Sequence, residues 1–392
     1  MAIAVADTPT RRDSKDAIFT APMLALSGLM VTSMSSFYLL LSAVPAYAAA
    51  LGGDLAAGFS TGALMATTIA GEIAAPQIIA RFGRRAALGA ALLILAIPCF
   101  TTFSASLMLV LLSCAARGFG LGVLLVAACG LAATLAPPAR RAEAMGLYGV
   151  ASAIPAILCV PIAPWALAAF GPVAMAVATA ALALAALASL AALPACAERA
   201  GGAAHSHPLP ALRYMAWPAA CLALGAIVIG ATITFLPLAH HEVGTGTIML
   251  ALLIQGLASA TARAAAGRSI DRHGPQGAMI GGVVLAVGAM LLLALPGGAA
   301  VLFGMALGGV AFGILQSASL AQLLNRAHPT QADGASAIWN AAYDAGLGLG
   351  GLAFGALAAT TGYAAAFIAA AAGLAAFALL VFRLCEAPRA SC

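Results

Sequence analysis

The long uncharged apolar runs of this chain constrain its fold more than any other feature. No Asp, Glu, Lys or Arg occurs between Ala144 and Ala197, or between His273 and Asn325. Each run could cross a bilayer twice at roughly 20 residues per helix. Charged residues are 7% of the chain, whereas soluble domains carry about 25%. The runs lack the alternation of barrel strands, so the sequence predicts an all-α polytopic protein in a lipid bilayer.

Charged and Pro/Gly-rich turns divide the chain into twelve expected transmembrane helices. Six precede a cytoplasmic linker at 194–212 and six follow it. We therefore expect an amino-terminal six-helix bundle at 1–193 and a carboxy-terminal bundle at 213–392. The expected helices are 18–47, 58–80, 85–103, 106–135, 142–165, 172–193, 213–238, 245–267, 276–295, 299–325, 334–359 and 363–384.

The two halves repeat at an offset of 191 residues. The offset aligns Glu72 with Arg263 and Gly83 with Gly274. Duplicated six-helix units are typical of secondary transporters, which bind substrate between the halves and rock one half against the other. An inert duplicated scaffold would carry the same repeat, so the repeat alone leaves both interpretations open.

The basic residues predict the orientation. With the amino terminus inside, fifteen of the seventeen Lys and Arg fall on the cytoplasmic side and none falls in an external loop, as the positive-inside rule requires. The predominance of Arg over Lys, with abundant Ala and Gly, indicates a GC-rich bacterial source. We expect a multi-pass protein of the bacterial inner membrane with both termini cytoplasmic. The basic residues form no continuous patch, so no nucleic-acid partner is expected.

Two equivalent loops carry the most specific motif. One reads GRSIDRHG from Gly267 to Gly274, and its counterpart reads PQIIARFGRR from Pro76 to Arg85. With the twelve spans and the repeat, these loops resemble the GxxxDRxGRR signature of the major facilitator superfamily over essentially the whole chain. The resemblance implies two pseudo-symmetric six-helix bundles, alternating access and a monomer. In the first copy Ala80 replaces the aspartate of the signature.

The resemblance also implies a cytoplasmic gate at these loops. In the family the aspartate locks the inward side through contacts with neighbouring helix ends. Because Ala80 cannot do so, Asp333 is the acid expected to pair with the arginines, which could otherwise serve only to set topology. The expected gate residues are Arg81, Gly83, Arg84, Arg85, Gly267, Asp271, Arg272, Gly274 and Asp333.

Two further helices resemble proton-coupled members of the superfamily. The fourth reads Arg117-Gly-Phe-Gly120-Leu-Gly122, similar to the RxxxG pattern of those members. The fifth keeps Pro155 of the antiporter signature but lacks most of its glycines. The general likeness is greatest to the twelve-span drug:proton antiporters.

Four charged residues fall inside expected helices: Glu72, Arg117, Arg263 and Asp344. A charge at the bilayer centre costs about 2.5–3.5 kcal/mol, so such residues usually face a cavity or a partner. The superfamily architecture implies that Glu72 and Asp344 face one cavity. Burial and a second carboxylate both disfavour the charged form, so we expect proton coupling by Asp344 and, second, by Glu72. A structural ion pair with either arginine is the alternative.

The remaining candidates bind substrate. Arg117 is expected to hold an anionic substrate group, or to keep a carboxylate ionised until substrate displaces it. Large hydrogen-bonding side chains are costly in a membrane without a polar environment, which favours a cavity position for the others. The expected substrate-binding residues are Arg117, Tyr38, Gln316, Asn340, Tyr343, Arg263 and Gln255.

Neither a metal site nor an enzyme motif is predicted. His240, His241 and Glu242 lack a closed ligand set, as do His205 and His207. The eight cysteines are scattered singly without CxxC spacing. The sequence contains no GK[ST] loop and no HExxH. We therefore expect no enzyme activity and no cofactor, with a proton gradient as the energy source.

These features together predict a secondary active transporter that exports a small organic compound, a drug or a metabolite, in exchange for protons. A proton-coupled uptake symporter for a small anionic nutrient would use the same charges. A non-transporting membrane sensor or scaffold is the alternative of another class, although no appended soluble domain supports it.

Overall fold

A computed structural model describes residues 20–136, 140–193, 212–326 and 332–386. The described part contains helices and no strand, which confirms the predicted all-α class. The helices are α1 (Ala21–Phe82), α2 (Arg84–Ala96), η1 (Ile97–Phe100), α3 (Leu107–Leu135), α4 (Arg141–Ala191), α5 (Leu212–Ala239), η4 (His241–Val243), α6 (Thr245–His273), α7 (Pro275–Leu293), α8 (Gly298–Arg326), α9 (Ala332–Thr361) and α10 (Tyr363–Glu386). Nearly all of the expected linker at 194–212 lies outside the described residues.

Two of these helices are each long enough for two membrane spans. Non-helical backbone interrupts α1 at Gly52 and Gly53 and α4 at Gly171. Gly53 has a φ of 73° and Gly171 a φ of 78°, which glycine adopts without a steric cost. The expected loop at 48–57 is therefore wrong in extent, because its alanines and leucines continue the helix on both sides of the glycine pair.

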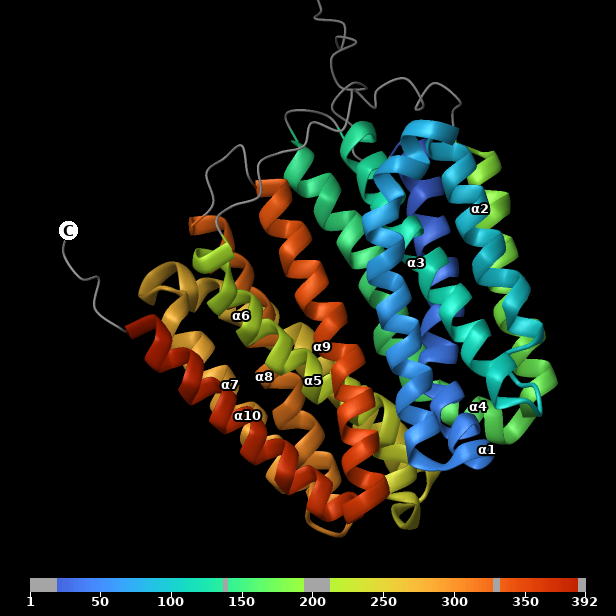
Figure 1. Ribbon diagram of the computed structural model, residues 1–392. Coiled ribbons are helices and arrows are strands. Elements are labelled where there is room, and N and C mark those ends of the chain that lie inside the picture. Colours follow the sequence, from blue (N-terminus) through green and yellow to red (C-terminus); the bar gives the residue numbers. More distant parts are fainter. Residues whose placement is uncertain (1–19, 137–139, 194–211, 327–331, 387–392) are drawn as a thin grey trace, which may run out of the picture.

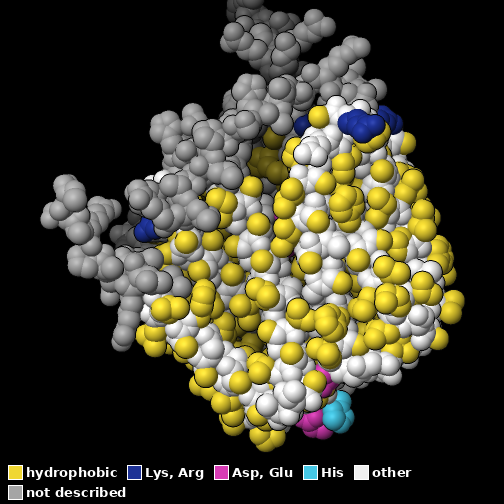
Figure 2. Space-filling model, in the orientation of Figure 1, with side chains coloured by type: hydrophobic (Ala, Val, Ile, Leu, Met, Phe, Trp, Pro, Cys, Tyr) yellow, Lys and Arg dark blue, Asp and Glu magenta, His cyan; other side chains and the backbone are white. Residues whose placement is uncertain are grey.

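The resulting arrangement is consistent with twelve spans. Within the described ranges, nine helices are long and apolar enough to cross a membrane, including α1 and α4. The short α2 continues directly into η1 to make one more span. Figure 2 shows hydrophobic side chains over the flank of the molecule, with Lys and Arg at one end and Asp, Glu and His at the other. The chain is a multi-pass membrane protein.

The spans form two groups (Figure 1). Helices α1 to α4 pack on one side and α5 to α10 on the other, and the groups meet through α1 with α9, α4 with α6, and α1 with α5. We call these groups the amino-terminal and carboxy-terminal halves.

Glycine packing reveals the same internal contact in both halves. Two glycines of α3 lie against backbone carbonyls of α1, so closely that a Cβ atom would overlap the carbonyl oxygen. Two glycines of α8 lie against carbonyls of α6 in the same way, each residue 191 positions after its counterpart. The glycine and carbonyl pairs are Gly118–Leu64, Gly122–Thr68, Gly309–Gln255 and Gly313–Ser259. The predicted offset therefore also relates three-dimensional contacts.

Candidate functional site

The two halves are in tight contact at one end, where the second part of α1 packs on α9. Gly58 of α1 faces the backbone of Gly351 and Leu352. Gly348 of α9 faces Met65 in turn. Figure 1 shows α1 and α9 meeting at this end and lying apart at the other. We call the end at which they meet the closed end, and the end that carries the arginines the basic end.

Glu72 and Asp344 lie beyond this contact, towards the basic end. Asp344 is four residues before Gly348, so it lies one helical turn further along the face of α9 that meets α1. Glu72 is seven residues after Met65, so it lies two turns further along the face of α1 that meets α9. Asp344 is buried, with 6% of its surface exposed, and Glu72 is half-buried. Asp344 lies within electrostatic range of Glu72. The structure thus brings the two predicted proton carriers together.

Two tyrosines complete this group, which we call the central acid cluster: Tyr38, Glu72, Tyr343 and Asp344. Tyr38 of α1 and Tyr343 of α9 both interact electrostatically with Asp344. The Tyr343 ring lies 5.8 Å from that of Phe312, centroid to centroid. The cluster therefore combines two acids, two phenols and an aromatic face, drawn from both halves.

Arg117 lies apart from the acids. It is buried, with 2% of its surface exposed. Its guanidinium donates to the Ser36 carbonyl oxygen at 3.1 Å and to Cys99 Sγ at 3.2 Å. Among the described residues, no carboxylate lies within ion-pair distance of Arg117. The structure therefore does not show the ion pair considered as an alternative role for Glu72 and Asp344.

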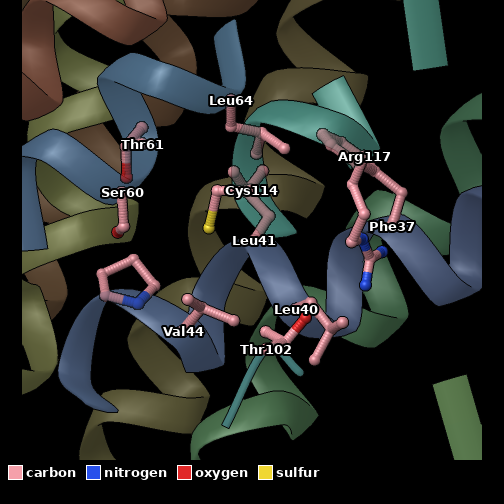
Figure 3. Close-up of a pocket in the computed structure, with 11 residues that line it drawn as sticks. Phe37, Leu40, Leu41, Val44, Ser60, Thr61, Leu64, Thr102, Cys114 and Arg117 are labelled. Carbon is pink, nitrogen blue, oxygen red and sulfur yellow. The ribbon is translucent and has the colours of Figure 1, made fainter. Parts of the chain in front are cut away.

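A mostly apolar pocket adjoins Arg117 within the amino-terminal half. Figure 3 shows side chains of α1 and α3 facing one another around it, with Arg117 at one edge. Ser60, Thr61 and Cys114 also line this pocket. The Thr61 hydroxyl forms a hydrogen bond with the Thr234 hydroxyl of the other half, with 3.0 Å between the two oxygens. The pocket therefore extends from Arg117 to the seam between the halves.

The other predicted substrate-binding residues lie in three different settings. Gln255 is buried and donates to the Thr232 hydroxyl at 2.9 Å, between α6 and α5 of one half. The side chain of Arg263 is exposed, and its carbonyl accepts from Ser317 at 3.0 Å. Gln316 is half-buried and Asn340 exposed. Within the described part of the chain, no contact places these four with the central acid cluster.

The predicted gate glycines occupy equivalent turns. Gly83 has a φ of 81° between α1 and α2, and Gly274 has a φ of 78° between α6 and α7. The amide of Gly83 donates to Ile79 and that of Gly274 to Ile270. Each glycine therefore ends one helix and begins the next.

The arginines of the first copy bind groups within their own half. Arg84 donates to the Thr134 hydroxyl at 3.1 Å and Arg85 to the Leu193 carbonyl at 2.8 Å. Arg81 is exposed and lies over the Phe82 ring. Arg272 is exposed, and Gly267 is half-buried inside α6. The side chains of Asp271 and Asp333 lie outside the described residues, so their expected pairing stays a prediction.

Several polar contacts carried no sequence signal. The Tyr363 hydroxyl donates to Asp54 across the closed end. His240 is buried. Its Nε2 atom lies 3.0 Å from the Leu293 carbonyl oxygen, and its ring stacks on that of Phe367. No grouping of three metal-ligating side chains occurs among the described residues. These contacts join residues far apart in sequence, so local spacing could not reveal them.

Comparison with known proteins identifies the family. The Major Facilitator Superfamily model matches residues 26–332 and 219–391. No curated protein matches the sequence. Among solved structures, the nucleoside transporter NupG is 13% identical with a TM-score of 0.75, covering 93% of this chain and 99% of that one. The xylose transporter XylE from E. coli is 17% identical with a TM-score of 0.73, covering 95% and 98%.

A bacterial homologue of the human lysosomal transporter Spinster, in an inward-facing and unoccupied conformation, is 14% identical with a TM-score of 0.73 and covers 95% of this chain and 96% of that one. At such identities the likeness shows the fold alone, and that fold is one of secondary active transporters that take small-molecule substrates. The family match and the fold agree over nearly the whole chain, which therefore belongs to the Major Facilitator Superfamily.

Proposed function

We propose that this chain is a proton-coupled exporter of small amphipathic organic compounds, with the central acid cluster as the shared site of proton and substrate. The observation that carries the proposal is the pair of interacting carboxyl groups at the seam between the halves. Among the described residues, no Lys or Arg lies within ion-pair distance of either Glu72 or Asp344. Two uncompensated negative charges in a membrane interior are costly, so a proton or a cationic group stabilises the pair.

The same geometry favours compounds with a basic group. A protonated amine and a proton would compete for the carboxyls of Glu72 and Asp344, and each ligand would favour release of the other. The rings of Tyr38, Tyr343 and Phe312 offer faces that attract cations and apolar groups. The Arg117 guanidinium already donates hydrogen bonds to two neutral groups, so we do not propose that it binds an anionic group of the substrate.

The closed end determines from which side the central acid cluster can be reached. The closed end separates the acids from one side of the membrane, while α1 and α9 lie apart towards the basic end (Figure 1). The positive-inside rule places the basic end in the cytoplasm. In this conformation a compound would approach the central acid cluster from the cytoplasmic side, as an exporter requires in one of its two states.

The test is substrate-evoked proton movement in proteoliposomes. The compound panel contains amines, neutral alcohols and carboxylates of matched size. Wild type is compared with Asp344→Asn, with Glu72→Gln, and with Glu242→Gln as a control acid at the exposed turn after α5. We expect amines inside to leave only as protons enter, and Asp344→Asn to abolish this exchange while Glu242→Gln behaves as wild type.

Other outcomes would replace the proposal. If a compound outside draws protons inward with it, and Asp344→Asn abolishes this, the chain is an uptake symporter. Unchanged coupling in Asp344→Asn with loss in Glu72→Gln would move the proton role to Glu72. If carboxylates are the only class that moves protons, the basic-group preference is wrong.

A further inference from the structure

We infer that Asp54, Tyr363, Thr61 and Thr234 form a latch that holds the halves together at the closed end. Its two hydrogen bonds join residues 309 and 173 positions apart. This latch would control access to the central acid cluster from the side opposite the basic end. It does not depend on the direction of transport or on proton coupling.

The first bond of the latch is built on two rigid turns. Asp54 directly follows the Gly52–Gly53 break of α1, and Tyr363 directly follows Gly362, which has a φ of 79°. The Tyr363 hydroxyl donates to Asp54 Oδ1 at 2.5 Å. A hydrogen bond from a hydroxyl to a carboxylate is roughly twice as strong as a hydrogen bond between neutral groups. The bond therefore fixes the start of α10 to the start of the second span of α1.

The second bond lies two helical turns deeper. Thr61 is seven residues after Asp54, which is about 10 Å along the helix and on the same face. Its hydroxyl pairs with that of Thr234 on α5 at 3.0 Å, and both threonines are buried. Between the two bonds, Gly355 of α9 approaches the backbone of Asp54. The latch thus consists of polar bonds at both edges of a close helix contact.

These bonds can be broken at moderate cost. Asp54 and Tyr363 are half-buried, so water can replace their bond when the halves part. A threonine hydroxyl in a helix can instead bond the carbonyl four residues earlier. The latch therefore favours the closed end without making it permanent, as a transporter that alternates between two states requires.

A native thiol reports on the state of the latch. Cys114 is buried and lines the pocket that Ser60 and Thr61 also line, next to the Thr61–Thr234 bond (Figure 3). When the halves part at Thr61, this pocket opens towards the closed end. Cys129 is exposed and lies fifteen residues further along the same helix, so it serves as an internal control.

The experiment measures alkylation of Cys114 by a membrane-impermeant maleimide, with peptide mass spectrometry as the readout. Sealed vesicles of both orientations are labelled, which separates access from the two faces. The key variant is Tyr363→Phe, which removes only the hydroxyl. Its matched control is Tyr47→Phe, because the Tyr47 hydroxyl donates to the Phe103 carbonyl at 2.9 Å within one half.

Tyr363→Phe should raise the rate of Cys114 labelling from the closed-end face by about three- to tenfold, the range for losing one ordinary hydrogen bond whose groups can reach water. Tyr47→Phe should label as wild type, and Cys129 should not change. Asp54→Asn, which keeps a neutral acceptor, should give an intermediate rise. The double variant Asp54→Asn/Tyr363→Phe should label no faster than Tyr363→Phe, because both changes remove one interaction.

The latch is disproved if Tyr363→Phe labels at the wild-type rate. It is equally disproved if Tyr47→Phe raises labelling as much, since general loosening would then explain the effect. Thermal unfolding of each purified variant shows whether the fold is intact. The Asp54→Asn comparison keeps the inference testable if Tyr363→Phe is unstable.

Discussion

At the scale of single residues, Arg117 shows how far a sequence can locate a functional side chain. Its place inside a membrane span could be predicted, because a lone charge in an apolar run is conspicuous. Its partners could not, because the Ser36 backbone carbonyl and the Cys99 sulfur belong to residues without a distinctive pattern. These neutral partners do not show the ion pair with an acid that the sequence leaves open as an alternative.

Replacing Arg117 by methionine should leave the stability of the fold unchanged or raise it, and should leave the exchange of amines for protons in place, because its guanidinium binds only neutral groups. The buried charge carries a cost of about 2.5–3.5 kcal/mol, and methionine removes it without leaving an oppositely charged partner buried and unpaired. The substitution would leave few groups unsatisfied, since Cys99 Sγ also donates to the Leu95 carbonyl. Thermal unfolding and transport of the purified protein check this, with the exposed Arg81→Met as control. A large loss of stability would make Arg117 a structural residue.

Glu242 provides a pH-dependent prediction outside the spans. A bond from its own backbone amide lowers the pKa of its carboxyl, and the charges of His240 and His241, 3.5 and 3.8 Å away, lower that pKa further. A lowered folded pKa gives stability that is present above the unfolded pKa of about 4.3 and is lost as pH falls through the folded value.

Glu242→Gln should therefore lower the thermal midpoint slightly in the window above about pH 4.3, where the wild-type carboxyl is charged in both the folded and the unfolded state. The difference from wild type should shrink as the pH falls below that window. Because the side chain is half exposed, the effect should also weaken in high salt. A difference that grows on acidification would contradict the assignment.

At the scale of elements, the apolar runs and glycines predicted the helices well and their interruptions less well. The turn glycines Gly83 and Gly274 could be predicted because a loop motif accompanies each of them. The break at Gly52–Gly53 was expected as a longer loop, because sequence alone does not show that a glycine pair suffices to reverse the chain. The packing of the helices on one another, rather than local helix propensity, sets where each helix ends and how long the turn is.

The repeated glycine contact makes an element-scale prediction. A Cβ atom at Gly118 would overlap the carbonyl of Leu64 on α1, so Gly118→Ala must push the two helices apart. Such overpacking costs about 1–3 kcal/mol. At Gly281 of α7 nothing lies within 4 Å of an added Cβ, and alanine there should gain up to about 1 kcal/mol of helix propensity.

Thermal unfolding of the two variants should therefore shift in opposite directions from wild type. Both variants replace a glycine by alanine inside a helix. A difference between them therefore reflects the packing around each position and not the kind of substitution. Gly309→Ala should repeat the loss seen for Gly118→Ala, since its Cβ would meet the carbonyl of Gln255. If Gly118→Ala and Gly281→Ala shift alike, the close contact does not limit stability.

At the scale of the whole molecule, the central acids could be predicted and the contacts that close the cavity could not. Glu72 and Asp344 are conspicuous because carboxylates are rare and expensive inside a membrane. Threonines and glycines are common in such helices and serve mostly in packing. The Thr61–Thr234 bond joins residues 173 positions apart, and only the assembled halves bring them together.

A cross-link at this bond tests whether the halves must separate there during transport. The hydroxyl oxygens of Thr61 and Thr234 lie 3.0 Å apart, so two cysteine sulfurs at these positions need only a small shift to form a bond of about 2.0 Å. Oxidation of Thr61→Cys/Thr234→Cys should stop transport almost completely, and reduction should restore it. Wild type under the same oxidant accounts for the native cysteines.

The matched control is Thr101→Cys/Ser113→Cys, whose hydroxyl oxygens lie 2.7 Å apart within the amino-terminal half. Its disulfide should form as readily and leave transport unchanged, because rigid rocking of the halves requires no separation inside one half. Mass spectrometry establishes that both disulfides have formed. Full transport with the Thr61–Thr234 positions cross-linked would mean that the closed end stays shut throughout the cycle, and that substrate leaves the central acid cluster by a different path.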